Sequence, residues 1–225
     1  MTLNGGIYMT IRDILQRFYQ LDAANGCTDA DLHAMEAKFG KLPAVLTQFY
    51  QCCGGIGEKL SVQDTWIMPE DFRAQPALLE KPFLMLLNEN QGVYCAAIRL
   101  GDLEQDDPPV FVSDDLGENW MPCADTLSDF LKAFLIYQAV FAFPCAAEDF
   151  SVLDADAFQN MQQRLTKFPF VVRNWFGTMH LFQDAPDSAA FALESDGEFQ
   201  VLYGAVQAES ARALAQKLDD LGEPM

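Results

Sequence analysis

Residues 28–57 constrain the fold more than any other part of the sequence. The first half of this segment carries apolar residues three and four positions apart, which predicts an amphipathic helix whose core face is Leu32, Met35 and Phe39. Thr28 can cap that helix, and Gly40 can end it because glycine adopts the left-handed conformation without steric strain. Pro43 fits the first turn of a second helix, and the glycines of residues 54–57 can end it. The segment therefore predicts two packed helices joined by a tight turn.

Four features of this segment have a recognisable spacing. They are Glu36, the turn Gly40-Lys41-Leu42-Pro43, the aromatic pair Phe49-Tyr50 and the pair Gly54-Gly55. In this spacing the chain resembles the SUKH superfamily, which includes bacterial toxin-immunity proteins and the fungal regulator of cell-wall synthesis. Gly54-Gly55 stands where the superfamily usually has Asn-Gly. The resemblance covers roughly residues 11–143 and implies an α+β fold, in which helices flank a central, mainly antiparallel sheet.

The pattern around this segment agrees with such a fold. Residues 11–19 have the spacing of an amphipathic helix, and a closing helix is expected after Thr126 or Ser128, either of which can cap it. Strands are expected at residues 65–68, 83–87, 93–100 and 109–113. Residues 114–120 are rich in turn-forming side chains, and this turn is expected to place Trp120 against the sheet.

An acidic stretch at residues 144–156 predicts a boundary, with a SUKH-like domain at 1–143 and an α+β extension at 144–225, packed on the first domain. The extension is expected to contain helices near 157–165 and 209–221 and strands at 178–183, 189–193 and 199–203. Asp196-Gly197 predicts a hairpin turn between the last two strands.

The net charge of −19 argues against binding to nucleic acid, because phosphate contacts require lysine and arginine. No apolar stretch approaches the roughly 20 residues that a membrane helix needs, and the N-terminus lacks the pattern of a signal peptide, so we expect a cytoplasmic protein. Either Met1 or Met9 can be the start of the protein. The six cysteines have no metal-binding spacing and are expected to be reduced thiols.

Signals for catalysis are weak, and we expect neither an enzyme nor a cofactor or metal site. His33 and His180 lack a metal-ligand spacing, and His180 alternates with apolar residues, so it is expected on the polar face of a strand. A nucleophilic pair of Cys52 or Cys53 with His180 stays open. Asp114 and Asp115 are adjacent on the chain and would face opposite ways on a strand. The run Asp102-x-Glu104-x-Asp106 lacks the glycine and the final glutamate of a calcium loop.

The distribution of charge is the stronger signal. Residues 101–131 contain no lysine or arginine but many acids. Crowded carboxylates repel one another, and a basic partner would relieve that repulsion, although they can also form a merely solvated surface. The candidate partner-binding residues are Glu36, Gly54, Gly55, Asp102, Glu104, Asp106, Asp107, Asp114, Asp115, Glu118 and Trp120. Trp66 and Tyr94 would join them if exposed, but are expected in the core.

Two functions follow from the resemblance. The first is an immunity protein that binds a cognate bacterial toxin and blocks it by occlusion; the toxin is expected to be a basic domain, such as a nuclease. The alternative is a housekeeping scaffold or regulatory interaction module of the same superfamily. The sequence leaves open the identity of the toxin, the oligomeric state and the contribution of the C-terminal third.

Overall fold

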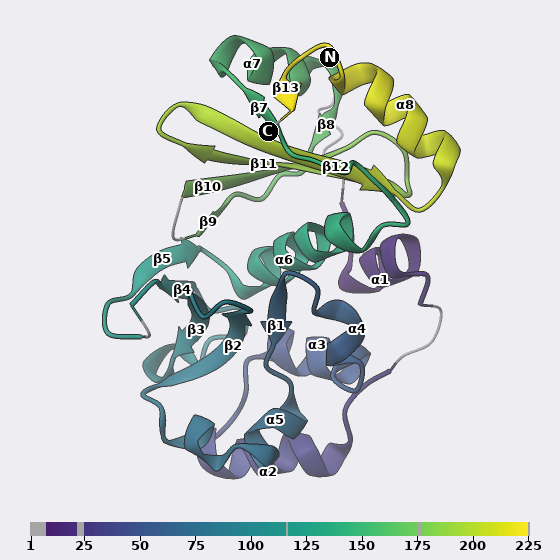
Figure 1. Cartoon of the computed structure of the whole chain (residues 1–225). Helices are drawn as coiled ribbons and strands as arrows, with labels where there is room; N and C mark the ends of the chain where they lie inside the picture. Colours follow the sequence, from purple (N-terminus) through teal and green to yellow (C-terminus); the bar gives the residue numbers. More distant parts are fainter. Residues whose placement is uncertain (1–7, 22–24, 116, 175–176, 225) are drawn as a thin grey trace, which may run out of the picture. The chain divides into compact units, whose positions relative to one another are not determined.

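The computed structural model describes residues 8–21, 25–115, 117–174 and 177–224, and it separates into two compact units (Figure 1). Residues 21–132 form the first unit, and residues 1–20 with 133–225 form the second. The boundary falls inside α6 (Leu127–Ala142), earlier than the predicted one, and the N-terminal helix groups with the C-terminal part. That residues 144–225 form a separate extension remains a prediction.

The first unit is built on a five-stranded sheet in which every neighbouring pair is antiparallel and strands follow in chain order. Its strands are β1 (Asp64–Trp66), β2 (Phe83–Glu89), β3 (Cys95–Arg99), β4 (Val110–Ser113) and β5 (Met121–Ala124). The expected strands correspond to β1–β4, whereas β5 was not predicted. β5 is short, contains Pro122 and has exposed residues at its first two positions, so it lacks an alternating pattern.

Helices accompany this sheet: α2 (Asp29–Phe39), α3 (Ala44–Cys53), α4 (Gly57–Leu60), α5 (Pro69–Ala74) and the short 3₁₀ turns η1 (Pro76–Glu80) and η2 (Leu100–Asp102). Pro43 directly precedes α3 and serves as its N-cap residue. Gly57 begins α4 and so does not act as part of a helix stop, which corrects the expectation for residues 54–57. In the core, the ring of Trp66 lies 5.3 Å from that of Phe49 and 6.1 Å from that of Phe130.

The second unit is built on a larger antiparallel sheet with the order β13-β7-β12-β11-β10-β8, to which β6 and β9 add on β12 and β10. Its strands are β6 (Cys145–Ala146), β7 (Ser151–Leu153), β8 (Thr166–Lys167), β9 (Val172–Asn174), β10 (Gly177–Gln183), β11 (Ser188–Ser195), β12 (Glu198–Ala205) and β13 (Glu223–Pro224). The three long strands were predicted, but the two- and three-residue strands are too short to show a period in the sequence. The turn between β11 and β12 has positive φ at Asp196 and Gly197, as expected for a tight hairpin.

Helices cover both faces of this sheet. On one face, α7 (Ala155–Arg164) and α8 (Ala208–Leu218) pack through Phe158, Met161 and Leu214 (Figure 1). On the other, the rings of Tyr137 and Phe141 in α6 lie 4.8 and 5.4 Å from the ring of Phe191. The helix α1 (Ile11–Tyr19) joins this unit, where the Tyr19 hydroxyl donates to the Leu135 carbonyl at 2.7 Å.

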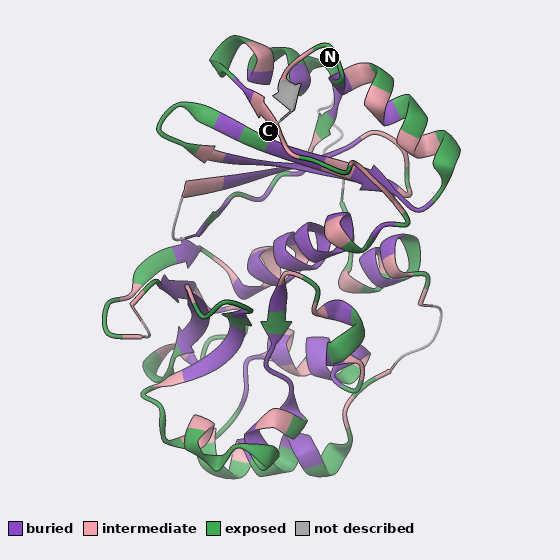
Figure 2. Ribbon diagram, in the orientation of Figure 1, coloured by how far each residue is buried: buried purple, intermediate pink, exposed green. Residues whose placement is uncertain are grey.

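The helices α6 and α8 differ in how many of their sides are buried, and a helix with apolar residues on every side is expected to be buried on every side. Figure 2 shows α6 buried over most of its length, whereas α8 alternates between buried and exposed positions. This contrast explains why α8 has a clear amphipathic pattern and α6 has a nearly continuous apolar one. In the part of the chain that the structure describes, no helix has the combined length and apolar character needed to span a bilayer.

We predict that Phe191→Ala lowers the free energy of unfolding by about 3–5 kcal/mol, because it opens a cavity among three aromatic rings where the sheet is covered on both faces. Denaturant unfolding followed by fluorescence measures the change. The control is Val171→Ala, whose side chain is exposed and should contribute less than about 0.5 kcal/mol. An equal effect of the two substitutions would contradict this packing.

Candidate partner-binding surface

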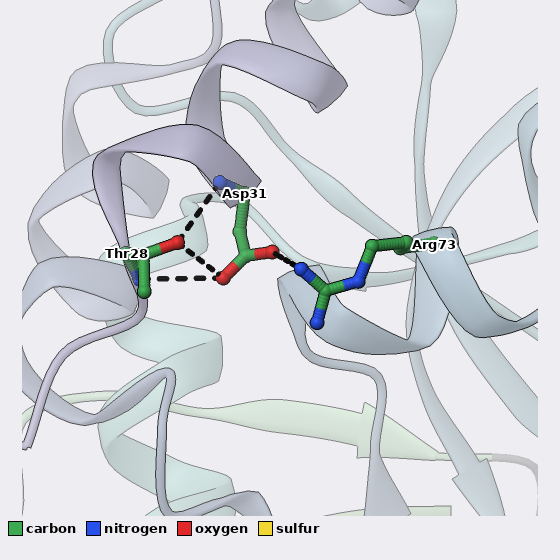
Figure 3. Close-up of polar contacts among 3 residues, drawn as sticks. All are labelled: Thr28, Asp31 and Arg73. Carbon is green, nitrogen blue, oxygen red and sulfur yellow. Dashed lines mark hydrogen bonds and ion pairs between the residues drawn. The ribbon is translucent and has the colours of Figure 1, made fainter.

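A buried carboxylate fixes the start of the α2 helix. The Thr28 hydroxyl donates to Asp31 Oδ2 at 2.7 Å, and the Asp31 amide donates back to the Thr28 hydroxyl at 3.2 Å. Arg73, from α5, donates to the other carboxylate oxygen of Asp31 at 2.6 Å (Figure 3). Thr28 therefore caps α2 as predicted, and the same acid also ties α2 to α5. The sequence placed Asp31 in the first helical turn but gave no sign of its partner.

The predicted pair Gly54-Gly55 lies where the chain crosses the end of α3. The amides of Asn25 and Cys27 donate to the Cys52 and Tyr50 carbonyls, both at 3.0 Å, and so satisfy helix-end acceptors. The Gly55 amide donates to the Asn25 carbonyl at 2.8 Å. A Cβ atom on Gly55 would come within 2.9 Å of a backbone oxygen, so the crossing needs glycine. Gly54 is buried there and Gly55 is exposed.

The connection between β3 and β4 lies against the turn that precedes α3. The Val45 amide donates to the Asp106 carbonyl at 3.1 Å, and the Lys41 ammonium lies 3.2 Å from the Asp106 carboxylate. In the same connection, Asp107 accepts from the Ser128 amide at 2.8 Å and from its hydroxyl at 2.6 Å. Asp107 therefore supports the first turn of α6. Thr126 caps that helix by accepting from the Asp129 amide.

The connection between β4 and β5 is organised by Asp115. Its carboxylate accepts from the Asn119 amide at 2.8 Å, from the Ser113 hydroxyl at 2.6 Å and from the Glu118 amide at 3.0 Å. These donors, the Asn119 amide first, lower the pKa of Asp115 to about 2. Trp120 stacks on Phe83 with ring centroids 4.2 Å apart, as expected for a turn that places it against the sheet.

The two acidic connections leave opposite ends of β4, so the structure divides the predicted acidic residues into two groups. Asp102, Glu104, Asp106 and Asp107 lie in the first connection; Asp114, Asp115 and Glu118 lie in the second. Glu104, Asp114 and Glu118 are exposed, and no ion pair joins them to a cation within the described residues. These carboxylates are available to a basic partner at both ends of the strand.

The other candidate residues lie apart from these connections or inside the core. Glu36 is half-buried in α2, and within the described chain no hydrogen bond or ion pair joins its side chain to either connection. Trp66 and Tyr94 are buried, in agreement with the expectation that they belong to the core. Trp120 is half-buried under its contact with Phe83. Whether any of these residues touches a partner stays a prediction.

A cleft of about 700 Å³ lies beside the β2–β3 hairpin, and the sequence did not indicate it. Its lining includes Leu78, Lys81, Met85, Glu89 and Tyr94. Behind it, Asp64 lies opposite Glu89 in the β1–β2 register and has no exposed surface. Burial, and secondarily the charge of Glu89, raises the pKa of Asp64 to about 7, against a hydrogen bond from Tyr94. The shifted carboxyl is enclosed and therefore does not reach a substrate in the cleft.

The structure corrects the expectation for His180, which is buried rather than on a polar face. Phe158 of α7 and Phe199 of β12 cover it, with ring centroids at 5.1 and 6.3 Å. Its two ring nitrogens lie 3.0 Å from Lys167 Nζ and 2.6 Å from Glu194 Oε2. Neither nitrogen is therefore free to activate a thiol, which argues against the pair with Cys52 or Cys53.

The remaining groups give no catalytic arrangement. His33 is exposed on α2. Within the described ranges, no group of three His, Cys, Asp or Glu is placed to hold a metal ion. All six cysteines are free thiols, and burial raises the pKa of Cys53 and Cys123 well above the usual range. A thiol with a raised pKa is a poor nucleophile at neutral pH.

The first unit is therefore an α+β domain with an antiparallel sheet, helices at its sides and acidic connections. Residues 26–133, just under half of the chain, match the model of the SMI1 / KNR4 family (SUKH-1). This match confirms the resemblance to the SUKH superfamily seen in the sequence, over a narrower range than residues 11–143. The comparison with curated proteins gives no match, and the comparison with solved structures gives none either.

We predict that Asp31→Asn lowers the free energy of unfolding by about 1–3 kcal/mol, because it weakens a helix cap and leaves Arg73 without its ion-pair partner. Thermal and denaturant unfolding measure the loss. Asp13→Asn is the matched control, since Asp13 forms the same capping box with Thr10 in α1 but is half-buried, whereas Asp31 is buried. A loss no larger than that of the control would show that the contact with Arg73 adds nothing.

The raised pKa of Asp64 predicts a pH dependence of stability. Its folded pKa of about 7 exceeds the usual 3.8, so the folded chain binds more protons and the stabilisation is lost as the pH rises from about 4 to above 7. Asp64→Asn should remove this loss, and its stability relative to the wild type should rise by about 2–3 kcal/mol between pH 5 and pH 8. Asp125→Asn, which changes an exposed carboxyl, should leave the slope unchanged.

Proposed function

We propose that this protein is a cytoplasmic immunity protein, which binds a cognate basic toxin domain and blocks it by occlusion. The observation that carries the proposal is the exposure of unpaired carboxylates on both acidic connections of a SUKH-1 segment. A basic partner would exchange repulsion between like charges for attraction and would be steered toward this surface during diffusion.

The hydrogen bonds decide which acids can serve this role. Asp107 and Asp115 use their carboxylates to hold α6 and the β4–β5 connection, so they shape the surface. Asp106 is partly neutralised by Lys41. Asp102, Glu104, Asp114 and Glu118 form no ion pair among the described side chains, although Asp102 accepts a hydrogen bond from Gln105, and they carry the proposed attraction.

The first experiment is a co-expression rescue. The toxin candidate is the C-terminal domain encoded by the gene next to this one, expressed in a sensitive cell with and without this protein. Growth that returns only with this protein, together with co-purification of the pair, would support the proposal. If the neighbour is harmless, or kills in either case, the toxin link fails and a scaffold or regulatory module becomes the better explanation, with an unbiased pull-down as the next step.

We predict that two double reversals slow association with that toxin by about tenfold or more at low salt, since each changes the local charge by +4. The pairs are Asp102→Lys with Glu104→Lys, and Asp114→Lys with Glu118→Lys. Stopped-flow or surface binding measures the association rate, and circular dichroism checks the fold. Because the pairs occupy opposite ends of β4, the more damaging one identifies the end that faces the toxin.

The matched control is Glu58→Lys with Glu70→Lys, which changes the charge equally at two exposed acids of the same unit outside the connections. It should slow association by less than about threefold. Equal association rates for all three double variants would mean that the net charge of the protein, and not the position of the acids, determines the association rate. The two acidic connections would then have no specific role in binding the toxin.

A further inference from the structure

The second unit contains a chain of three charged or titratable side chains that the family match does not cover. Lys167 from β8, His180 from β10 and Glu194 from β11 all lie beyond residues 26–133. The Lys167 ammonium lies 3.0 Å from His180 Nδ1, and His180 Nε2 lies 2.6 Å from Glu194 Oε2. The His180 side chain is 11 % exposed, whereas the Glu194 side chain is 42 % exposed and so partly open to solvent.

The chemistry of the three groups fixes the proton on the imidazole. A lysine ammonium has only donors, so His180 Nδ1 must accept its hydrogen bond. The ring proton therefore resides on Nε2 and is donated to the Glu194 carboxylate. In this geometry the neutral histidine connects a cation to an anion. A second proton would occupy Nδ1, remove the acceptor of Lys167 and place two cations 3.0 Å apart.

The surroundings make this arrangement sensitive to charge. Burial lowers the pKa of His180 and the nearby Lys167 lowers it further, whereas Glu194 opposes both. The uncharged rings of Phe158 on α7 and Phe199 on β12 lie 5.1 and 6.3 Å from the imidazole, and no ion pair joins His180 to a side chain of either element among the described residues. On β9, the exposed Arg173 pairs with Thr178, which precedes His180 by two residues on β10.

We propose that Lys167, His180 and Glu194 form an acid-sensitive contact, which holds β8 on β10 while the imidazole is neutral and releases Lys167 when the imidazole takes up a proton. The element released is small. β8 pairs with β10 only at Phe182 and Gln183, and the next amide, that of Phe168, donates to the Leu181 carbonyl at 2.9 Å. Loss of the Lys167 contact therefore leaves this edge strand held by two backbone pairings and by the buried side chains of Leu165 and Phe168 beside it. The contact with Glu194 persists because it becomes an ion pair.

The chain is well suited to a direct test, since it has only two histidines. We predict that NMR titration of the full chain gives a pKa for the buried His180 below the ordinary histidine value of 6.5. Lys167→Met removes the neighbouring cation and should raise the pKa of His180. Glu194→Gln removes the anion and should lower it.

Hydrogen exchange tests the release itself. Below the pKa of His180, the protection factor of the Phe168 amide should fall by about tenfold, which corresponds to about 1.4 kcal/mol, while that of the Ala147 amide, bonded to Tyr203 on β12, should not. In Lys167→Met this dependence on pH should disappear. The proposal is wrong if the pKa of His180 is not below 6.5, if both substitutions shift that pKa in one direction, or if the Phe168 amide keeps its protection after His180 is protonated.

Discussion

The burial of Trp66 is the constraint on which the first unit depends. Its indole lies between rings from α3 and α6 and so fixes the edge strand β1 on the core. Side chains two residues apart on a strand point to the same face, so burying Trp66 also carries Asp64 inside. Asp64 then lies opposite Glu89, and the carboxyl can stay enclosed only by keeping its proton up to about neutral pH. The packing of Trp66 thus places a titrating carboxyl group, that of Asp64, in the core, and this placement needs no catalytic explanation.

In the two acidic connections, neighbouring carboxylates have different structural roles. Asp107 and Asp115 are turned toward backbone amides and hydroxyls, and they give the two connections a defined shape. Glu104, Asp114 and Glu118 have no such partner among the described residues and are exposed. An acid-rich segment would be expected to be mobile if all its charges were solvated, since like charges repel. Internal hydrogen bonds at two positions allow the remaining charges to be held in a fixed pattern.

The sequence predicted those parts of the fold that have a long and regular period. The helices with caps at Thr28 and Thr126, the long strands and the Asp196-Gly197 turn all leave local signals, and each was found. The sequence could not predict β5 or the two-residue strands, because so few residues show no alternation. It was wrong about His180, since alternation indicates a polar face only where that face meets water, and α7 covers this one. Pairings such as Asp31 with Arg73 join distant positions and have no local signature.

Two buried titratable groups, one in each unit, give the chain opposite responses to pH. Asp64 has a raised pKa, so its contribution to the first unit weakens as the pH rises toward 7 and beyond. His180 has a lowered pKa, so its contribution to the second unit weakens as the pH falls below the ordinary value of 6.5. The cause is the same in both cases, because burial penalises whichever form carries the charge. The sign differs because an acid gains charge by losing a proton, whereas an imidazole gains charge by binding one. A rise in pH from about 4 to above 7 therefore weakens the first unit, whereas a fall in pH below 6.5 weakens the sheet of the second unit.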